Sequence, residues 1–165
     1  SAPCYESIDK TEIIVMNNSI EYSWSDAISE GIILGYLYDY NRASQSYEFG
    51  DSLEPGFGYW IWAYYDCELL IFSNSVGNGH ITNLEEDWAI VGLPYNDTIS
   101  KTSVNITNNS IDYSWDEAVS EGILLNFVYG WNNTNQLYEF SNDLAPGRGY
   151  WMYSYYNCTL FRPET

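Results

Sequence analysis

Hydrophobic and polar residues follow the same order twice along this chain. Residues 18–34 recur as residues 109–125, with 12 of 17 positions identical and a constant offset of 91. The same offset aligns residues 47–49 with 138–140, residues 55–60 with 146–151, and Cys67 with Cys158. A repeat that keeps one register over this distance indicates two copies of one structural unit. We therefore predict module one at residues 1–72, a Ser/Gly/Asn-rich connector at residues 73–86, and module two at residues 87–165.

The pattern within each copy predicts a β-rich unit with one short helix. Ser114 and Glu117 form a capping box in module two, and Ser23 begins a weaker version in module one. Each helix should end after about two turns, because Gly31 or Gly122 supplies a left-handed terminal residue. Apolar and aromatic runs predict the strands, at residues 12–16, 32–40, 45–49 and 58–65, and at 88–93, 103–106, 123–131, 136–140 and 149–156. The expected fold is mainly β, with two tandem homologous modules that are each a compact sandwich or a partly open barrel.

The last long strand of each module is apolar on both faces. The aromatic residues of one face are Trp60, Trp62, Tyr64, Trp151, Tyr153 and Tyr155. A half-exposed strand would alternate apolar with polar residues. We expect the opposite face, rich in Tyr, Ile and Met, to be buried. The Trp/Tyr face should contact something outside its own module: another subunit, the neighbouring module or a sugar.

Module one lacks the opening strand of module two. The counterpart of residues 88–93 would fall before Ser1, and Pro163 shortens the final strand of module two, because proline donates no ladder hydrogen bond. An open sheet edge over an apolar face favours strand addition from another chain. We expect copies to join head to tail, with a strand or tail of one copy completing module one of the next. The alternative is that the chain is a fragment of a longer array.

Charge and composition exclude several classes of partner. There are 23 acidic residues against five Lys and Arg, which gives a net charge of −18, and the cations are scattered. Nucleic acid and anionic membranes, which need clustered cations, are therefore excluded as partners. No apolar run approaches the roughly 20 residues of a membrane span. Residues 85–87 are acidic but lack the spacing of a calcium loop, so we expect no cofactor, with calcium at most an accessory ion.

Asparagine sequons and cysteines indicate a secreted, cell-surface protein. Covalent N-glycans are expected at the N-x-S/T sequons Asn17, Asn96, Asn105, Asn108, Asn132 and Asn157. A disulfide between Cys4 and Cys67 would leave Cys158 for an intermolecular bridge, and Cys158 bonded to Cys4 of another copy is the alternative. Residues 1–3 are typical of a mature terminus left after signal cleavage.

No catalytic constellation is present in the sequence. His80 has no nucleophile motif near it, and there is no C-x-x-C, H-E-x-x-H or Walker pattern. The candidate acids Glu48 and Glu139, or Glu30 and Glu121, are copies of one another at equivalent positions. Two catalytic carboxylates need different environments. We therefore predict a protein that is not an enzyme.

The opening and closing motifs resemble a known class of module. Residues 88–94 (Trp-Ala-Ile-Val-Gly-Leu-Pro) and 146–151 (Pro-Gly-Arg-Gly-Tyr-Trp) are similar to the W-x-L-I-x-L-P and G-x-G-Y-W strands of a repeat in secreted archaeal and bacterial cell-surface proteins. The resemblance covers module two and all but the opening of module one. It implies an extracellular structural or binding role and no catalytic residues. We expect a homopolymeric subunit of a cell-surface filament, sheath or S-layer-like assembly; the alternative is a carbohydrate-binding or adhesive module.

Overall fold

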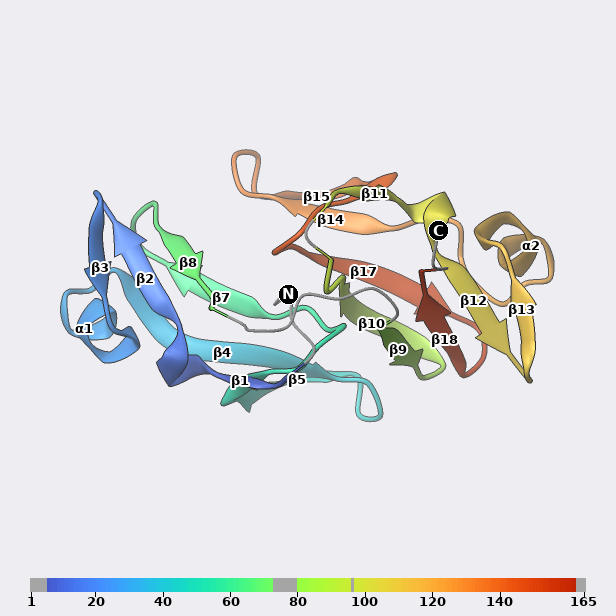
Figure 1. The fold of residues 1–165 in the computed structure, drawn as a ribbon, viewed down its shortest axis with the longest axis horizontal. Helices are drawn as coiled ribbons and strands as arrows, with labels where there is room; N and C mark the ends of the chain where they lie inside the picture. Colours follow the sequence, from blue (N-terminus) through green and yellow to red (C-terminus); the bar gives the residue numbers. More distant parts are fainter. Residues whose placement is uncertain (1–5, 73–79, 96, 163–165) are drawn as a thin grey trace.

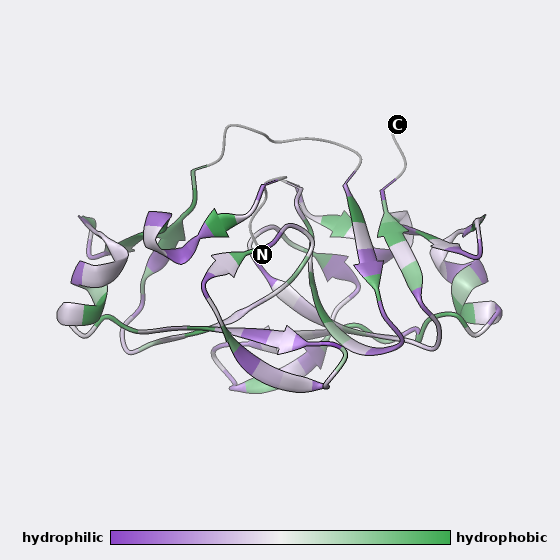
Figure 2. Cartoon of the chain, turned by 90° about the horizontal axis from the view of Figure 1, so that it is seen from below, coloured by the Kyte–Doolittle hydropathy of each residue, from purple (hydrophilic) through white to green (hydrophobic). Residues whose placement is uncertain are grey.

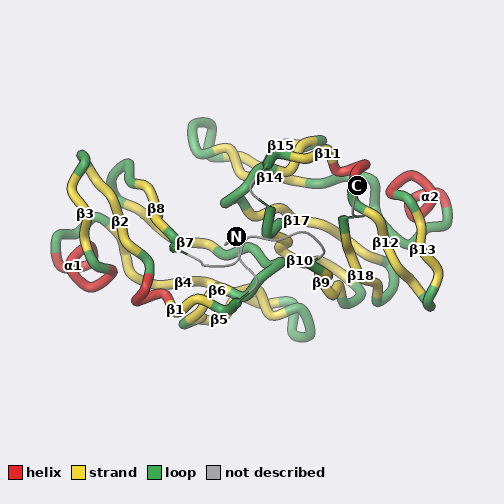
Figure 3. The backbone as a smooth tube through the Cα atoms, in the orientation of Figure 1, coloured by secondary structure: helices red, strands yellow, loops and turns green. Residues whose placement is uncertain are grey.

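The computed structural model describes residues 6–72, 80–95 and 97–162, and these residues form a mainly β protein with two short α-helices (Figures 1 and 3). The first half (residues 6–72) contains β1 (Ile8–Asp9), η1 (Lys10–Glu12), β2 (Ile14–Asn17), β3 (Ile20–Tyr22), α1 (Trp24–Ser29), β4 (Ile33–Asn41), β5 (Ser46–Gly50), β6 (Ser52–Leu53), β7 (Trp60–Ala63) and β8 (Glu68–Leu70).

The second half (residues 80–95 and 97–162) begins with two strands, β9 (Ile81–Leu84) and β10 (Asp87–Gly92). The remaining elements follow the order of the first half: β11 (Ile99–Ser100), η2 (Lys101–Ser103), β12 (Asn105–Asn108), β13 (Ile111–Tyr113), α2 (Trp115–Ser120), β14 (Tyr129–Asn132), β15 (Leu137–Phe140), β16 (Asp143–Leu144), β17 (Gly149–Ser154) and β18 (Cys158–Phe161). Only β9 and β10 have no counterpart among the described residues of the first half.

The two helices begin and end at the predicted residues. The Ser114 backbone N–H donates to the Glu117 carboxylate at 2.9 Å, while the Ser114 hydroxyl accepts from the Glu117 N–H at 3.4 Å. Ser23 caps α1 in the same way through its hydroxyl. Gly31 and Gly122 follow the helices at φ 68° and 67°, a conformation that glycine adopts without strain. Neither helix of the described chain is long and apolar enough to span a membrane.

Two four-stranded antiparallel sheets enclose the core of the second half. Their orders are β10-β17-β14-β15 and β13-β12-β18-β9. Val91, Tyr150 and Met152 from the first sheet and Ile106 and Leu160 from the second belong to one cluster of eighteen buried residues. The two strands that lack a counterpart, β9 and β10, each form an edge of one sheet. These two consecutive strands therefore complete both sheets around this core.

The first half has the same two sheets with one strand fewer in each. Their orders are β5-β4-β7 and β3-β2-β8. Its buried cluster contains nine residues, half as many as the second half. Within the described ranges, no strand lies along the free edge of β7 or of β8. Among the described residues, each of these sheets therefore lacks a counterpart of one strand, β10 in one sheet and β9 in the other.

The two halves lie side by side with an approximate two-fold relation (Figures 1 and 2). Helices α1 and α2 lie at opposite ends, and the turn before β7 crosses β10 in the centre. The Gly58 N–H donates to the Ile90 carbonyl at 2.9 Å, and the Gly92 N–H donates to the Gly56 carbonyl at 3.0 Å. A Cβ on Gly58 would lie 2.8 Å from the Cα of its repeat equivalent, Gly149, so glycine is required where the halves cross.

Four strands of the second half, β9, β11, β13 and β16, lie outside the predicted strands, and β9 is the longest of them. Strand β9 lies within residues 73–86, which the sequence assigned to the connector, and residues 73–79 lie outside the described residues. In β9, Thr82 and Leu84 are buried and Ile81 is exposed. Because a threonine faces the core and an isoleucine faces solvent, the alternation of this strand is weak in the sequence.

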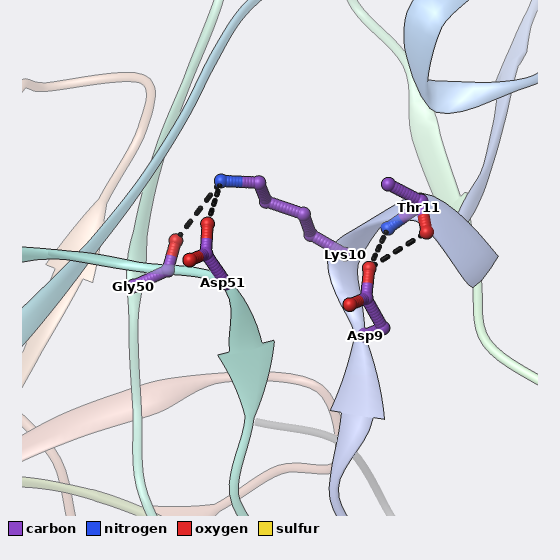
Figure 4. Close-up of polar contacts among 5 residues, drawn as sticks. All are labelled: Asp9, Lys10, Thr11, Gly50 and Asp51. Carbon is purple, nitrogen blue, oxygen red and sulfur yellow. Dashed lines mark hydrogen bonds and ion pairs between the residues drawn. The ribbon is translucent and has the colours of Figure 1, made fainter.

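A single-turn 3₁₀-helix delays β2 and β12 by two residues relative to the strands predicted at 12–16 and 103–106. Asp9 causes this in the first half, because its carboxylate accepts from the Thr11 N–H at 2.8 Å and from the Thr11 hydroxyl at 2.6 Å (Figure 4). Lys10 then reaches Asp51 at 2.6 Å and ties this turn to the strand region after β5.

Strand β14 is shorter than the predicted strand at 123–131. Asn126 interrupts it, because the Asn126 carbonyl accepts from Lys101 Nζ at 2.7 Å and its side-chain oxygen accepts from Trp115 Nε1 at 3.1 Å. The first half has Gly35 at this position. Its φ of 82° lets β4 continue through a shift in register against β7.

Candidate assembly surface

The open side of the first half forms a groove of about 620 Å³. Strands β7 and β8 and the residues beside them form its floor, with Tyr59, Ile61, Ala63, Cys67, Leu69 and Ile71. The facing wall comes from the second half, where Trp131, Tyr138 and the turn at residues 146–149 line it. The groove thus runs along the two free strand edges of the first half.

The same floor is covered in the second half. The repeat equivalents of Tyr59, Ile61, Cys67 and Leu69 are Tyr150, Met152, Cys158 and Leu160, which are 3%, 2%, 5% and 2% exposed. In the first half all four positions are half-buried. Since the sequences of these strands are similar, the difference comes from β9 and β10, which cover one floor and not the other.

Two residues of the predicted aromatic face lie between the halves. Trp60 meets Trp131 edge-on, with ring centroids 5.1 Å apart, and Trp151 meets Tyr40 edge-on at 4.6 Å. These contacts are equivalent under the repeat, because Trp60 aligns with Trp151 and Tyr40 with Trp131. Trp151 also donates from Nε1 to the Tyr138 hydroxyl at 3.1 Å. Both tryptophans therefore contact residues outside their own repeat, and they do so within one chain.

The other four residues of that face differ in exposure. Trp62 and Tyr64 in the first half and Tyr155 in the second are exposed, and Tyr153 is half-buried. Tyr153 packs edge-on against Trp88 at 5.2 Å with an interplanar angle of 70°. Stacking on a sugar ring needs an exposed flat face, and the steep angles around Trp60, Trp151 and Tyr153 do not form a flat platform.

A second aromatic surface was missed by the sequence reasoning. Phe49 and Phe140 project from the hairpins β4–β5 and β14–β15 and are 71% and 68% exposed. Phe49 contacts Tyr36 and Phe140 contacts Phe127, each with ring centroids 5.0 Å apart. Exposed apolar side chains that recur at equivalent positions form a candidate contact surface on each half. The repetition of aromatic residues at these positions was the available signal.

The five basic residues all have contacts within the chain. Arg42 stacks on Phe57 with its guanidinium carbon 4.0 Å from the ring centroid. The others bond acids or carbonyls: Lys10 with Asp51, Lys101 with the Asn126 carbonyl, Arg148 with the Trp131 carbonyl, and Arg162 with Asp97. Most of the acids face solvent. Copies of this chain should therefore repel one another at low ionic strength and approach more readily as salt screens the charge.

The equivalent sequons Asn17 and Asn108 are the last residues of strands β2 and β12. The Asn17 side-chain amide donates to the Asp66 carbonyl at 2.8 Å, and Asn108 donates to the Asn157 carbonyl at 2.8 Å. Asn157 is exposed, and its side-chain oxygen accepts from the Glu86 N–H at 2.8 Å. An N-linked glycan retains one amide hydrogen, so these bonds are compatible with modification.

The other sequons differ in access. Asn132 donates to Glu139 at 3.0 Å and its oxygen accepts from the backbone N–H of Thr134 at 2.9 Å, which fixes the β14–β15 turn. Asn105 lies half-buried within β12. Asn96 lies outside the described residues.

The cysteines are in different environments. Cys158 is buried in the core of the second half, and burial raises the pKa of its thiol to about 11. Cys67 is half-buried in the groove floor, and burial together with the Asp66 charge raises the pKa of its thiol. Both described thiols are free, and Cys4 lies outside the described residues. In this conformation Cys158 is covered by the core of its own half, and the intermolecular bridge through it stays a prediction.

The candidate acids have structural contacts. Hydrogen bonds from Asn132 and Asn135 hold the pKa of Glu139 below its usual value, and Glu48 accepts from Asn41 at 2.9 Å. Glu85 and Glu86 of the acidic run are exposed. Across the described ranges, no three His, Cys, Asp or Glu side chains gather closely enough to hold a metal ion.

No family model, no curated protein and no solved structure matches the chain. Function is therefore inferred from the repeat, the groove and the exposed aromatic surfaces.

Proposed function

We propose that this protein is a non-enzymatic, extracellular structural subunit of a cell-surface filament, sheath or S-layer-like assembly. Each subunit contains two tandem homologous modules of the β-sandwich or partly open barrel type. Copies join through strand sharing and aromatic contacts. This proposal is consistent with the resemblance of the opening and closing strands to repeat modules of secreted cell-surface proteins.

The observation that carries this proposal is the uncovered floor of the first half. Tyr59, Ile61 and Leu69 leave a half-exposed apolar surface beside two free strand edges. Free edges present unpaired backbone groups to solvent, and natural proteins usually cover, shorten or charge them. Strand addition from another polypeptide pairs these backbone groups and buries the apolar floor in one step.

The hairpin aromatic residues support a second type of contact. Phe49 and Phe140 are exposed at equivalent positions on the two hairpins, and each is backed by a second ring. A subunit with the same apolar surface on both halves can contact neighbours on two sides. A contact of this kind that does not close into a ring propagates as a filament or sheet.

Secretion and glycosylation are part of the same proposal. Exposed or half-buried sequons lie at strand turns on both halves, which is where glycans are accommodated. The acidic surface would keep single subunits soluble before they assemble.

Electron microscopy of native material is the direct test. The expected result is ordered polymers, with mass spectrometry finding glycans at turn sequons such as Asn17 and Asn108. Because Cys158 is buried, we expect polymers to survive treatment with a reductant. Monomers at all salt concentrations would contradict the proposal, and binding of those monomers to a glycan array would favour the carbohydrate-binding alternative.

A further inference from the structure

The groove of the first half is lined by the repeat equivalents of residues that β9 and β10 cover in the second half. We propose that it is a receptor for a two-stranded β-hairpin with the burial pattern of β9 and β10, supplied in trans by another polypeptide that carries this repeat. The inference rests on the proposed function, in which polypeptides share strands, and it specifies what is shared. The occupant is a hairpin that contacts both open sheets, and a single strand or the chain's own C-terminal tail would cover only one.

The register of β10 specifies the strand of the occupant that would pair with β7. In the second half, Ala89 pairs with Met152 and Val91 pairs with Tyr150. The repeat equivalents of Met152 and Tyr150 are Ile61 and Tyr59, which are half-buried in the groove. An occupant strand in this register would place small or branched apolar residues against both.

The register of β9 specifies the strand of the occupant that would pair with β8. Leu84 pairs with Cys158, and Thr82 pairs with Leu160. The equivalents in the first half are Cys67 and Leu69, on the floor of the groove. Since Cys158 is covered in this way in the second half, an occupied groove should protect the Cys67 thiol.

The turn on the facing wall of the groove, at residues 146–149, is the repeat equivalent of a turn that β9 of the second half covers. A Cβ on Gly56 would lie 2.3 Å from Thr82 Oγ1, because β9 packs directly on that turn. Its equivalent, Gly147, has nothing within 4 Å of the same position. Gly147 lines the groove. The space beside Gly147 is therefore open, whereas β9 fills the equivalent space beside Gly56. The approximate two-fold relation would place a second hairpin in this open space.

The number of hairpins excludes simple exchange between copies. The described residues contain one β9–β10 hairpin. The second half already uses this hairpin to cover its core. If one copy donated β9 and β10 to another, it would open its own second half, so exchange leaves the number of open grooves unchanged. The occupant is therefore an additional hairpin.

The test measures how fast Cys67 reacts with a thiol reagent in the full chain. Cys4 is replaced by serine, so that Cys67 is the accessible thiol and Cys158 remains as a buried internal control. The probe is a synthetic peptide of residues 80–94, which spans β9 and β10. At about ten times its dissociation constant, the peptide should slow labelling of Cys67 about tenfold, because about a tenth of the grooves stay empty.

Two control peptides separate the groove from non-specific adhesion. A peptide with Leu84→Asp and Val91→Asp places a charge at one inward position of each strand and should give no protection. A peptide with Asn83→Ser changes an outward position and should protect as well as the parent.

Two variants of the protein provide the reciprocal control. Ala63 is exposed, so Ala63→Arg should fold, but its equivalent Ser154 is buried and donates to the Glu85 carbonyl at 2.8 Å beneath the hairpin. Ala63→Arg should therefore abolish protection by the peptide. Tyr64→Arg changes the next exposed residue, whose equivalent Tyr155 stays exposed, and should leave protection intact.

Three results would overturn the inference. The first is unchanged labelling of Cys67 at saturating peptide. The second is protection that survives Ala63→Arg or occurs equally with the charged peptide. The third is a Cys67 that is already protected in the isolated chain while the chain elutes as a dimer, since a second copy would then fill the groove. If the peptide binds in the groove but the protein forms no polymers, the inference that the groove receives a hairpin stands and the proposed function is contradicted.

Discussion

The two halves of this chain share a repeated sequence and differ in how completely their cores are covered. Each half has a short helix capped by serine and a hairpin at the equivalent position. In the second half, β9 and β10 cover Met152 and Leu160; in the first half, the equivalent residues Ile61 and Leu69 remain half-buried. The comparison shows that a local sequence can specify the elements of a module while the burial of its core depends on strands from elsewhere.

Thiol chemistry should give the largest difference between the halves. We expect Cys158 to react with a thiol reagent at least about a hundredfold more slowly than Cys67, because it is buried and the pKa of its thiol is raised further. Mass spectrometry of the labelled chain at mild alkaline pH measures both rates. Equal rates would mean that the first half is covered or that the second half opens freely.

Matched core truncations should give the next largest difference. Leu160→Ala removes a fully buried side chain and should lower the free energy of unfolding by about 3 kcal/mol. Leu69→Ala removes a half-exposed one and should lower it by about 1 kcal/mol, because less apolar area leaves water on folding. Urea unfolding followed by circular dichroism compares them. A larger loss for Leu69→Ala would contradict the difference in burial.

Alkaline pH should destabilise both halves. Burial raises the pKa of Tyr59 to about 12 and that of Cys158 to about 11. A folded-state pKa above the unfolded value means that the stabilisation is complete below the unfolded pKa and is lost as pH rises through the folded pKa. Stability should therefore fall between about pH 9 and pH 12. Tyrosinate absorbance and circular dichroism recorded together test this, and ionisation of all tyrosines well before unfolding would be the opposite result.

The smallest difference should come from the helix caps. Ser114→Ala removes a reciprocal capping box and should lower stability by about 1 kcal/mol. Ser23→Ala removes a one-sided cap and should lower it by about half as much. Thermal unfolding of the two variants measures the difference. An equal effect of both would show that the Glu117 side chain adds nothing to the cap.

Local signals in the sequence predicted both helices and the long strands, and they missed the short strands such as β3 and β13. Ser114 and Gly122 bounded α2, because capping depends on neighbouring residues. The constant offset of 91 also aligned the elements of the first half with those that follow β10 in the second. Strand β9 was missed because Thr82, a polar residue, faces the core.

Long-range packing could not be predicted in this way. The contact of Trp60 with Trp131 and the burial of Cys158 both depend on strands that are distant in sequence. Periodicity indicates that a face is apolar, and it does not identify the surface that covers it. The sequence therefore predicted that the aromatic face contacts something outside its own module. It did not choose between the other half and another molecule, and it did not identify the residues that Trp60 and Trp151 contact.

Hydrogen–deuterium exchange on the isolated chain and on assembled material tests the central claim most directly. In the isolated chain, amides of β7 and β8 should exchange much faster than those of β17 and β18, because their outer edges have no strand partner among the described residues. On assembly, β7 and β8 should become as slow as their equivalents. Equal exchange in the isolated chain, or no slowing on assembly, would contradict a first half that another polypeptide completes.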